Sequence, residues 1–176
     1  MHHKIVPLFT TEQIALRNAE LAREIAASKP HRLLVVAILK GSFVFAADLI
    51  RELHHAGLKP EMEFMMLSSY YEGMESSGKV KIIQDVESPV EGRDVLLVDD
   101  ILESGRTLAF AKDLLAARGA KSVQSCVLLE KPNKRAVTLN PDYTGFTCPD
   151  LFVVGYGMDV AHAYRQLPFV GVVQTD

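Results

Sequence analysis

The chain has 176 residues, 48% of them hydrophobic, and its nineteen basic and twenty-two acidic residues leave a formal net charge of −3. This length suits one domain, residues 1–176, with a core large enough to fold alone. The absence of a basic run interleaved with aromatic residues argues against nucleic acid as a partner. The N-terminus lacks the apolar core of a signal peptide, and no apolar run approaches the roughly 18 residues of a membrane span. We therefore expect a cytoplasmic protein that does not contact a membrane.

The first half of the chain predicts alternating helices and strands. Thr10 and Gln13 form a capping box before an amphipathic helix, which Lys29-Pro30 ends. Short runs rich in Val, Ile, Leu and Met then predict buried strands, separated by a second helical stretch. The predicted segments are a strand over Leu33–Leu39, a helix over Phe43–His55, a strand over Met62–Leu67 and a shorter strand over Lys79–Gln84.

Residues 95–108 carry the most informative pattern. The apolar run Val95–Val98 reads as a parallel strand buried on both faces, and it ends in Asp99 and Asp100, with Glu103 three positions later. Sheets of alternating strands and helices bind ligands outside the carboxyl ends of such strands. The three acids are therefore predicted to lie beside a ligand.

A turn of small, polar and basic residues follows the acids, and we call residues 104–107 the phosphate turn. Ser104, Gly105, Arg106 and Thr107 offer successive backbone N–H groups, two hydroxyls, a cation and the positive end of a following helix. These groups suit a phosphate monoester. Carboxylates next to a phosphate cup indicate a phosphorylated sugar, because acids accept hydrogen bonds from hydroxyls and share a divalent cation with phosphate.

The second half continues the alternation. A helix over Thr107–Arg118, ended by Gly119, leads to a strand over Val123–Leu129. A right-handed crossover makes this strand parallel to Val95–Val98, which brings Lys131 to the edge that carries the acids. Short strands are expected at Phe152–Val154 and Val170–Val173.

Five blocks in this order resemble one known family. Residues 95–108 are similar to the signature of the type I phosphoribosyltransferases, and four further blocks narrow the resemblance to the hypoxanthine-guanine phosphoribosyltransferases. The further blocks are Leu39-Lys40-Gly41, Ser68-Ser69-Tyr70, Leu128-Leu129-Glu130-Lys131, and residues 152–156 with Asp159 and Arg165. The match covers nearly the whole chain. It implies a central, mainly parallel sheet flanked by helices, with a small hood formed by the N-terminal and C-terminal segments.

The resemblance also implies the reaction and the binding of its first substrate. The family transfers the phosphoribosyl group of phosphoribosyl pyrophosphate to N9 of hypoxanthine or guanine, which gives IMP or GMP and pyrophosphate. Asp99 and Asp100 would hold the ribose, and the phosphate turn would hold the 5-phosphate. Lys40, Gly41 and Arg165 would bind the pyrophosphate, with a non-proline cis peptide bond at Lys40-Gly41.

Magnesium is the implied cofactor, because its hard charge prefers phosphate and carboxylate oxygens. Asp159 would be the protein ligand, with Asp99 and Asp100 in or near the shell around the ion. Position alone favours another interpretation of Asp159, as the cap of a helix over residues 160–164.

The resemblance assigns the purine to a further group of residues. Lys131 would donate to the 6-oxo group, Phe152 would stack on the base, and the main chain of Val153 would read its edge. Glu103 would accept the purine proton, although the family more often has Asp at this position. The extra methylene moves the carboxylate by roughly an ångström. We therefore expect turnover to depend less on Glu103 than on the phosphate-binding groups.

Residues 68–78 join two predicted strands with small and polar residues, including two glycines. A loop of this kind can close over a site as a lid and exclude water. The resemblance assigns Ser69 and Tyr70 to that closure. It also implies a homodimer or homotetramer.

Other functions fit the sequence less well. The spacing of Gly73 to Val80 approaches a nucleotide-binding P-loop, but Val80 replaces the required hydroxyl and Lys79 opens a strand. A response-regulator receiver would carry its acid pair near the N-terminus and would leave the phosphate turn unexplained. The remaining alternative is a non-catalytic relative that senses phosphoribosyl pyrophosphate, since Glu103 departs from the usual pattern.

Overall fold

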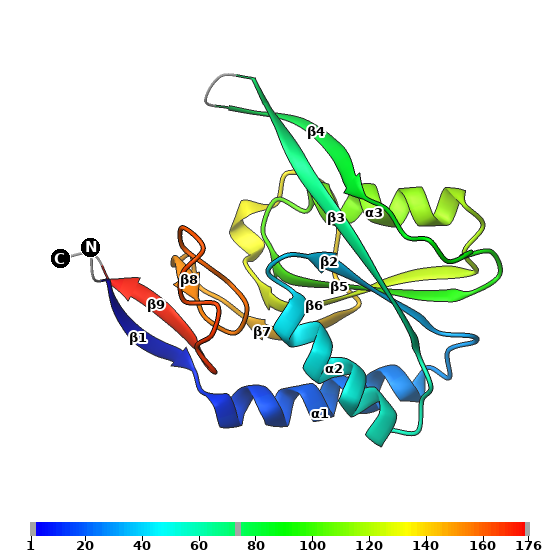
Figure 1. The fold of residues 1–176 in the computed structure, drawn as a ribbon, viewed down its shortest axis with the longest axis horizontal. Helices are drawn as coiled ribbons and strands as arrows, with labels where there is room; N and C mark the ends of the chain where they lie inside the picture. Colours follow the sequence, from blue (N-terminus) through cyan, green and yellow to red (C-terminus); the bar gives the residue numbers. More distant parts are fainter. Residues whose placement is uncertain (1–2, 73–74, 175–176) are drawn as a thin grey trace.

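A computed structural model describes residues 3–72 and 75–174, without the side chains of residues 70–77 (Figure 1). The elements in order are β1 Lys4–Phe9, α1 Thr11–Ala27, β2 Leu34–Leu39, α2 Phe43–His55, β3 Glu61–Glu72, β4 Glu75–Gln84, β5 Asp94–Leu102, α3 Arg106–Ala117, β6 Ser122–Glu130, β7 Tyr143–Thr147, β8 Val153–Val154 and β9 Val170–Gln174, with a 3-10 turn at Pro132–Lys134. The six-stranded sheet has the order β4-β3-β2-β5-β6-β7, and every pair except β3–β4 is parallel. This arrangement confirms the predicted fold class.

Helices cover both faces of this sheet. On one face α1 and α2 pack through residues such as Leu21 and Leu49, and on the other face α3 packs through Leu108 and Leu115. The central strands β2 and β5 are buried on both faces, because a parallel sheet with helices on each side leaves neither face to water. Their carboxyl ends therefore meet at one rigid edge.

Local signals predicted α1 and α2 well. The Thr10 hydroxyl accepts from the Gln13 N–H while the Gln13 side chain accepts from the Thr10 N–H, which confirms the capping box. The predicted bounds of α2 agree with the structure. For α3 the structure shifts both bounds back by one residue, from 107–118 to 106–117.

The predicted loop over residues 68–78 was wrong in part. Strand β3 continues to Glu72 and β4 begins at Glu75, so most of this segment is an antiparallel hairpin, with Ser69 opposite Val80. In Figure 1 the hairpin forms an arm that extends away from the sheet. Pairing across the hairpin overcame the weak strand propensity of Ser, Glu and Gly. The side chain of Tyr70 and residues 73–74 lie outside the described part.

A second, three-stranded sheet joins the two ends of the chain. Its order is β1-β9-β8, and β9 pairs antiparallel with both neighbours. The sequence had predicted strands in the C-terminal segment but not β1, whose pairing partner is far away in the chain. These are the segments expected to form the hood. They lie at one end of the molecule, beyond β7 (Figure 1).

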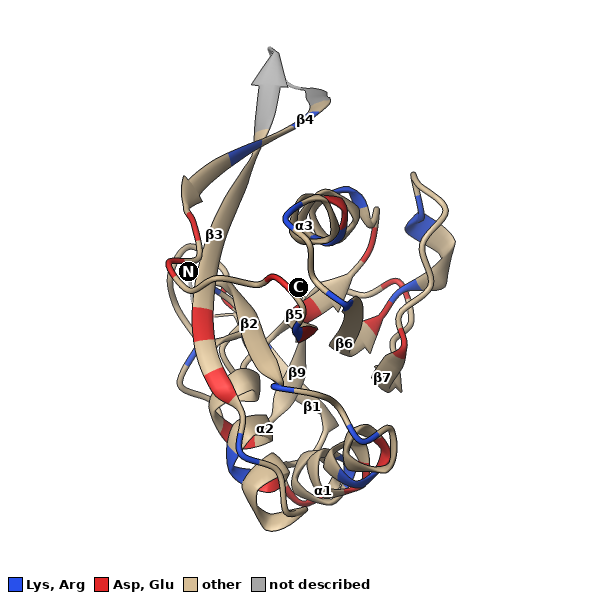
Figure 2. Cartoon of the chain, turned by 90° about the vertical axis from the view of Figure 1, so that its right-hand side faces the viewer, with Lys and Arg blue, Asp and Glu red and all other residues tan. Residues whose placement is uncertain are grey.

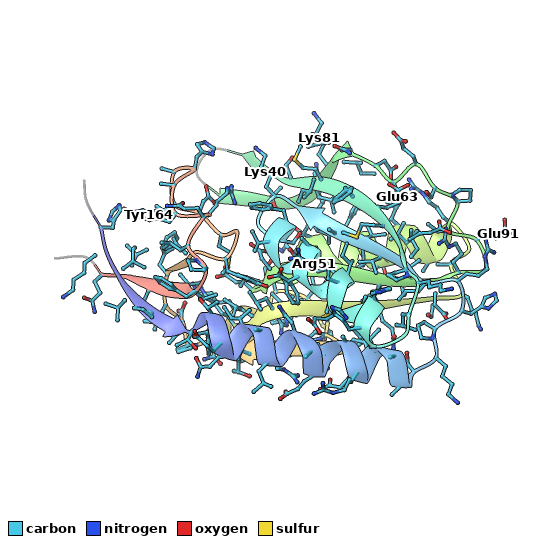
Figure 3. All side chains as sticks on the ribbon, turned by 60° about the horizontal axis from the view of Figure 1, so that its bottom comes forward. Lys40, Arg51, Glu63, Lys81, Glu91 and Tyr164 are labelled. Carbon is cyan, nitrogen blue, oxygen red and sulfur yellow. The ribbon has the colours of Figure 1, made fainter. Side chains whose placement is uncertain are left out.

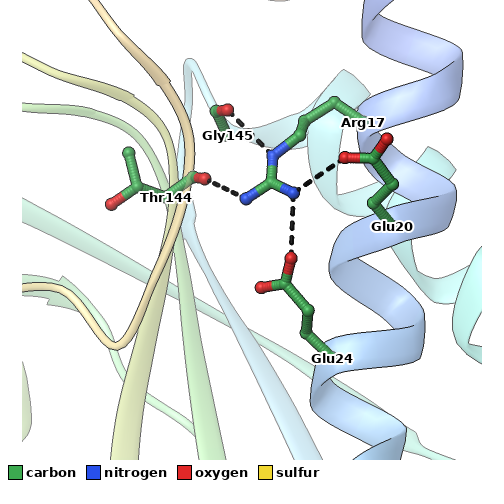
Figure 4. A network of polar contacts seen from close by, with 5 residues as sticks. All are labelled: Arg17, Glu20, Glu24, Thr144 and Gly145. Carbon is green, nitrogen blue, oxygen red and sulfur yellow. Dashed lines mark hydrogen bonds and ion pairs between the residues drawn. The ribbon is translucent and has the colours of Figure 1, made fainter.

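A network around Arg17 fixes α1 to strand β7 at the edge of the large sheet (Figure 4). Its Nε donates to the main-chain oxygen of Gly145 at 2.9 Å, and its Nη2 donates to that of Thr144 at 2.7 Å. Its Nη1 pairs with Glu20 and Glu24, at 3.0 and 2.9 Å. The guanidinium thus uses its fork to join a helix surface to main-chain acceptors.

Basic and acidic residues are interspersed along the elements, as on α1 and α3 in Figure 2. None of the helices in the described part of the chain is long and apolar enough to cross a membrane.

Candidate functional site

A pocket of about 350 Å³ opens at the carboxyl end of β5. Its lining brings together the predicted acids and three residues of the phosphate turn. It comprises Ile38, Asp99, Asp100, Ile101, Leu102, Glu103, Ser104, Gly105, Thr107 and Leu108. Strand β5 runs to Leu102, four residues beyond the predicted Val98, because Asp99, Ile101 and Leu102 still pair with β6. The acid pair therefore lies on the strand itself, which holds it more rigidly than a loop would.

The two aspartates place like charges side by side. Asp99 accepts a hydrogen bond from the Asp100 N–H at 2.9 Å, and Asp100 accepts one from the Ile101 N–H at 2.8 Å. Removal from water, followed by the charge of Asp100, raises the pKa of Asp99 well above its usual range. Bound groups that donate hydrogen bonds, or a cation, would relieve this repulsion.

Gly41 packs directly against the acid pair. A Cβ atom at Gly41 would lie 2.0 Å from Oδ2 of Asp100, so a larger residue there would force the carboxylate or the turn to move. The carbonyl oxygen of Gly41 in turn faces Gly157, where an added Cβ would approach it to 2.6 Å. Two glycines thus let three separate segments of backbone converge beside Asp100.

The cis peptide bond lies between Leu39 and Lys40, one bond earlier than the Lys40-Gly41 bond that the resemblance implied. Directly after it, the Ser42 hydroxyl is buried and donates to the main-chain oxygen of Ile38 at 2.6 Å, which closes the turn between β2 and α2. Lys40 is exposed on this turn. Figure 3 shows it toward the same end of the molecule as Tyr164 of the C-terminal segment, and far from Glu91.

Arg165 reaches the same region through Gly157. Its Nη1 donates to the main-chain oxygen of Gly157 at 2.6 Å, and its Nη2 lies 3.2 Å from Oδ1 of Asp159. The sequence placed Arg165 and Asp159 in one site without predicting that they would form an ion pair.

Asp159 does not cap a helix. Residues 160–164 form a tight turn in which Ala161, His162 and Tyr164 have positive φ, and Oδ2 of Asp159 accepts from the His162 N–H at 2.9 Å. Within the described residues, no three His, Cys, Asp or Glu side chains form a metal-binding cluster. A magnesium ion here would therefore need oxygens from its substrate as well.

The phosphate turn has the backbone of an anion-binding loop. Gly105 precedes α3 with φ of +81°, which favours glycine, and the Arg106 N–H donates to the Ser104 hydroxyl at 3.3 Å. The Arg106 side chain extends toward β4, where its guanidinium would meet a Cβ atom at Gly78 at 3.3 Å. The structure thus places the backbone of Arg106 in the turn and its charge beside the hairpin.

Glu103, which lines the pocket, forms an ion pair with Lys131. Nζ of Lys131 donates to Oε1 of Glu103 and to the main-chain oxygen of Leu151, both at 2.8 Å. The Lys131 side chain is 7% exposed and that of Glu103 is 43% exposed, so the lysine is the fixed partner. An ammonium has three donors, and the pair leaves one for a ligand.

Phe152 and Val153 lie next to this pair but differ in exposure. The ring of Phe152 is 57% exposed, whereas Val153 is buried in β8 and pairs with Val172 of β9. An exposed aromatic ring beside a fixed ammonium is a surface on which a flat heterocycle can stack. Core packing, the plainer interpretation of Phe152, does not fit its exposure.

Sequence reasoning left out several residues that shape the site. Ser42 and Gly157 act through close backbone contacts, and Arg135 donates to the main-chain oxygen of Glu103 at 2.8 Å. The positive φ of Gly157, +97°, could have been suspected from the Gly-Tyr-Gly sequence of residues 155–157. Nothing in the sequence pattern predicted the contact of Arg135.

The chain is similar to several known proteins. The family model described as the phosphoribosyl transferase domain matches residues 8–161. A hypoxanthine phosphoribosyltransferase of Buchnera aphidicola is 42% identical over 98% of both chains. A hypoxanthine-guanine phosphoribosyltransferase of Lactococcus lactis is 45% identical, over 96% of this chain and 91% of that protein. A solved hypoxanthine phosphoribosyltransferase of Trypanosoma cruzi, in complex with the product IMP, is 36% identical with a TM-score of 0.90, over 98% of this chain and 95% of that one.

The chain belongs to the phosphoribosyltransferase family. Within that family, its relatives are hypoxanthine or hypoxanthine-guanine phosphoribosyltransferases, which confirms the branch that the five sequence blocks predicted.

Proposed function

We propose that this chain is a purine-salvage enzyme that transfers the 5-phosphoribosyl group of phosphoribosyl pyrophosphate to N9 of hypoxanthine or guanine. The products are IMP or GMP and pyrophosphate. The observation that carries the proposal is one pocket lined by the acid pair, three residues of the phosphate turn and Glu103, whose carboxylate pairs with the buried Lys131. The names of the relatives support the same reaction.

The pocket divides into a ribose half and a phosphate half. Asp99 and Asp100 are acceptors for the ribose hydroxyls, and such hydrogen bonds would offset the repulsion that raises the pKa of Asp99. The N–H groups of residues 104–107, the hydroxyls of Ser104 and Thr107 and the N-terminus of α3 would hold the 5-phosphate. The Arg106 side chain contributes longer-range charge.

Pyrophosphate would bind between two turns. Lys40 supplies an ammonium and Gly41 supplies backbone next to Asp100, while Arg165 supplies a guanidinium from the opposite segment. These cations would stabilise the negative charge that develops on the leaving group as the ribose bond breaks. The Asp159 carboxylate holds Arg165 in place.

Magnesium fits this donor set. The partly buried acid pair of Asp99 and Asp100 favours a cation. Asp159 lies beside Arg165, whose guanidinium would contact the pyrophosphate. These residues would hold the ion, partly through retained waters. When bound, it would neutralise charge on the pyrophosphate.

Lys131, Phe152 and Val153 would select the purine. The third N–H of Lys131 would donate to a 6-oxo group, whereas the amino group of adenine offers it a donor. Phe152 provides the stacking surface and the main chain of Val153 provides an edge. Glu103 would accept the proton that the purine loses, and its ion pair with Lys131 holds it beside the lysine that would select the base.

Further parts of the proposal concern closure, assembly and location. The hairpin of β3 and β4, with Ser69 and Tyr70, would act as the lid that excludes water from the activated ribose. The protein would work in the cytoplasm as a homodimer or homotetramer and as a single domain, residues 1–176. One solved Trypanosoma cruzi relative concerns the role of the C-terminal region in the oligomeric state and enzymatic activity of that protein.

The direct test offers hypoxanthine, guanine, xanthine and adenine separately with phosphoribosyl pyrophosphate and magnesium, and measures release of pyrophosphate. We expect rapid release with hypoxanthine or guanine and little with adenine. If no base supports release, the non-catalytic sensor becomes the better explanation.

A variant of Glu103 tests the proton acceptor. Glu103→Gln keeps the shape of the side chain and removes its charge, so turnover should fall by about tenfold, less than the roughly 100-fold or more that a proton-transfer group usually contributes. Binding of phosphoribosyl pyrophosphate, measured by calorimetry, should stay nearly the same. Glu91→Gln is the matched control, because Glu91 lies before the start of β5 and Glu103 follows its end. Unchanged turnover in Glu103→Gln would refute the role.

A further inference from the structure

The segment after β6 passes directly behind the phosphate turn. The N–H of Lys131 donates to the oxygen of Leu102 at 2.9 Å, and the N–H groups of Ala136 and Val137 both reach the oxygen of Ser104, at 2.9 and 3.3 Å. This segment therefore contacts the main chain on both sides of Glu103, at Leu102 and at Ser104. The same stretch of chain that carries the purine-selecting lysine also supports the phosphate turn.

Arg135 is the side chain at the centre of this support. Its Nη1 donates to the main-chain oxygen of Glu103 at 2.8 Å, and its Nη2 donates to Oε1 of Glu130 at 2.7 Å. The side chains of Arg135 and Glu130 are only 16% and 20% exposed. Glu130 is held in turn by the hydroxyl of Thr144, 3.3 Å from its Oε2.

Arg135 stands on the far side of the turn from the substrate pocket. It lines a separate hollow together with Glu130 and Val137, whereas Ser104 lines the pocket of the acid pair. Its Cδ would lie 3.3 Å from a Cβ atom at Gly105, so the arginine also fills the space behind that glycine. Since its charge is already paired with Glu130, Arg135 is not a phosphate-binding cation.

The bond to the Glu103 oxygen has a geometric consequence. The C=O and N–H of a trans peptide unit point in opposite directions within one plane. With the oxygen of Glu103 held toward Arg135, the N–H of Ser104 points the other way, toward the pocket. The same peptide unit begins at Glu103, so its orientation also affects the position of the Glu103 side chain.

We propose that Arg135 is a positioning residue, which fixes the Glu103–Ser104 peptide so that the N–H groups of the phosphate turn converge on the 5-phosphate. Glu130 orients the arginine, and the segment 131–137 thereby couples the purine-selecting Lys131 to the phosphate turn. This inference rests on the proposed function.

The test compares Arg135→Met, Arg135→Lys and Glu130→Gln with the wild type. The matched control is Arg118→Met, which removes a forked pair with Asp85, at 2.8 and 2.6 Å, at the far end of α3. Two readouts are needed: the kcat and KM for each substrate, and the Kd of ribose 5-phosphate from calorimetry. The second measures the phosphate turn without any turnover.

Loss of a charged hydrogen bond in a partly buried setting corresponds to about 10- to 100-fold in affinity. Arg135→Met should therefore raise the Kd of ribose 5-phosphate and the KM for phosphoribosyl pyrophosphate by about this factor, with a smaller change in the KM for hypoxanthine. Arg135→Lys should recover part of the loss, because lysine can replace one of the two bonds. Arg118→Met should change neither constant.

An unchanged Kd for ribose 5-phosphate in a folded Arg135→Met protein would overturn the proposal. If that variant does not fold, Arg135→Lys and Glu130→Gln decide the question, and wild-type constants in both would overturn it as well. The proposed function fails separately: a wild type that binds ribose 5-phosphate but releases no pyrophosphate with any purine would refute the enzyme and leave the positioning role testable.

Discussion

The two ends of β5 both carry aspartates, and they differ in how those carboxylates are satisfied. At the start of the strand, Asp94 accepts from the His31 N–H at 2.6 Å and from the Ser122 hydroxyl at 2.7 Å. Burial alone would raise the pKa of Asp94, but these hydrogen bonds lower it. At the end of the strand, burial and Asp100 raise the pKa of Asp99. At the first end the partners come from other segments of the protein, whereas Asp99 and Asp100 accept from the N–H of the residue that follows each and line the pocket.

The largest effect expected from this difference is on turnover. Asp100→Asn keeps the size of the side chain but removes a charge next to the ribose and Gly41. We expect kcat/KM for phosphoribosyl pyrophosphate to fall by about 100-fold or more, as for other groups that stabilise developing charge. The free energy of unfolding should not fall, because a repulsion is removed. A stable variant with wild-type kcat/KM would contradict the proposed role of the acid pair.

A somewhat smaller effect is expected from the close approach at Gly41. Gly41→Ala would bring a methyl group to 2.0 Å from Oδ2 of Asp100 and force the carboxylate or the turn to move. Turnover should fall by about tenfold or more.

Gly57→Ala is the control for that variant. Gly57 has φ of +91° and open space around it, so alanine there costs about 1 kcal/mol of stability and no activity. Steady-state rates and thermal unfolding should therefore be measured for both variants. Gly41→Ala should lose turnover, whereas Gly57→Ala should lose stability and keep its activity. An inactive Gly57→Ala, or a fully active Gly41→Ala, would break the comparison.

At the start of β5 the expected effect is on stability alone. Asp94→Asn weakens two hydrogen bonds and should lower the free energy of unfolding by about 1 kcal/mol at pH 7, with turnover unchanged. Because the pKa of Asp94 is depressed on folding, its contribution is present above the unfolded pKa of about 4 and is lost as the pH falls through the folded value. Urea unfolding at pH 7 and pH 3 should show the difference from wild type shrinking in acid.

The smallest effect is that of Asp99→Asn on the free energy of unfolding, and its sign is opposite to that of Asp94→Asn. Because folding raises the pKa of Asp99, its ionised form costs stability above the folded pKa, and this cost disappears once the pH falls below the unfolded value of about 4. Asp99→Asn should therefore unfold at higher urea than the wild type at pH 7, with the gain closing in acid, while it loses activity. A decrease in stability at pH 7 would show that the folded protein tolerates this charge.

The parts of the fold that the sequence predicted are those with local signals. The bounds of α2 and the capping box of α1 depend on residues within one or two turns. By contrast, β1 contains Pro7 and pairs with β9 at the other end of the chain, and β7 contains Gly145, so neither has a strand pattern of its own. The outer part of the β3–β4 arm, residues 68–72 and 75–78, was missed because these residues become strands only by pairing across the hairpin.

The site divides in the same way. Contiguous motifs predicted the acid pair and the phosphate turn, and both line the pocket. Contacts across strands were not predictable, because they depend on side-chain length and backbone direction. The ion pair of Glu103 with Lys131 and the donation from Arg135 are of this kind. The position of the cis peptide bond, at Leu39-Lys40 and not one position later, was not predictable from the composition either.

The Arg17 network has a consequence for solubility. Strand β7 ends the large sheet, and an exposed sheet edge offers unpaired main-chain groups to strands of other molecules. Arg17 already occupies two oxygens of β7, at Thr144 and Gly145. At the opposite edge, β4 carries lysines such as Lys81, whose charge would have to be desolvated on pairing (Figure 3). Both edges are thus protected against aggregation, by a guanidinium at one and by ammonium groups at the other.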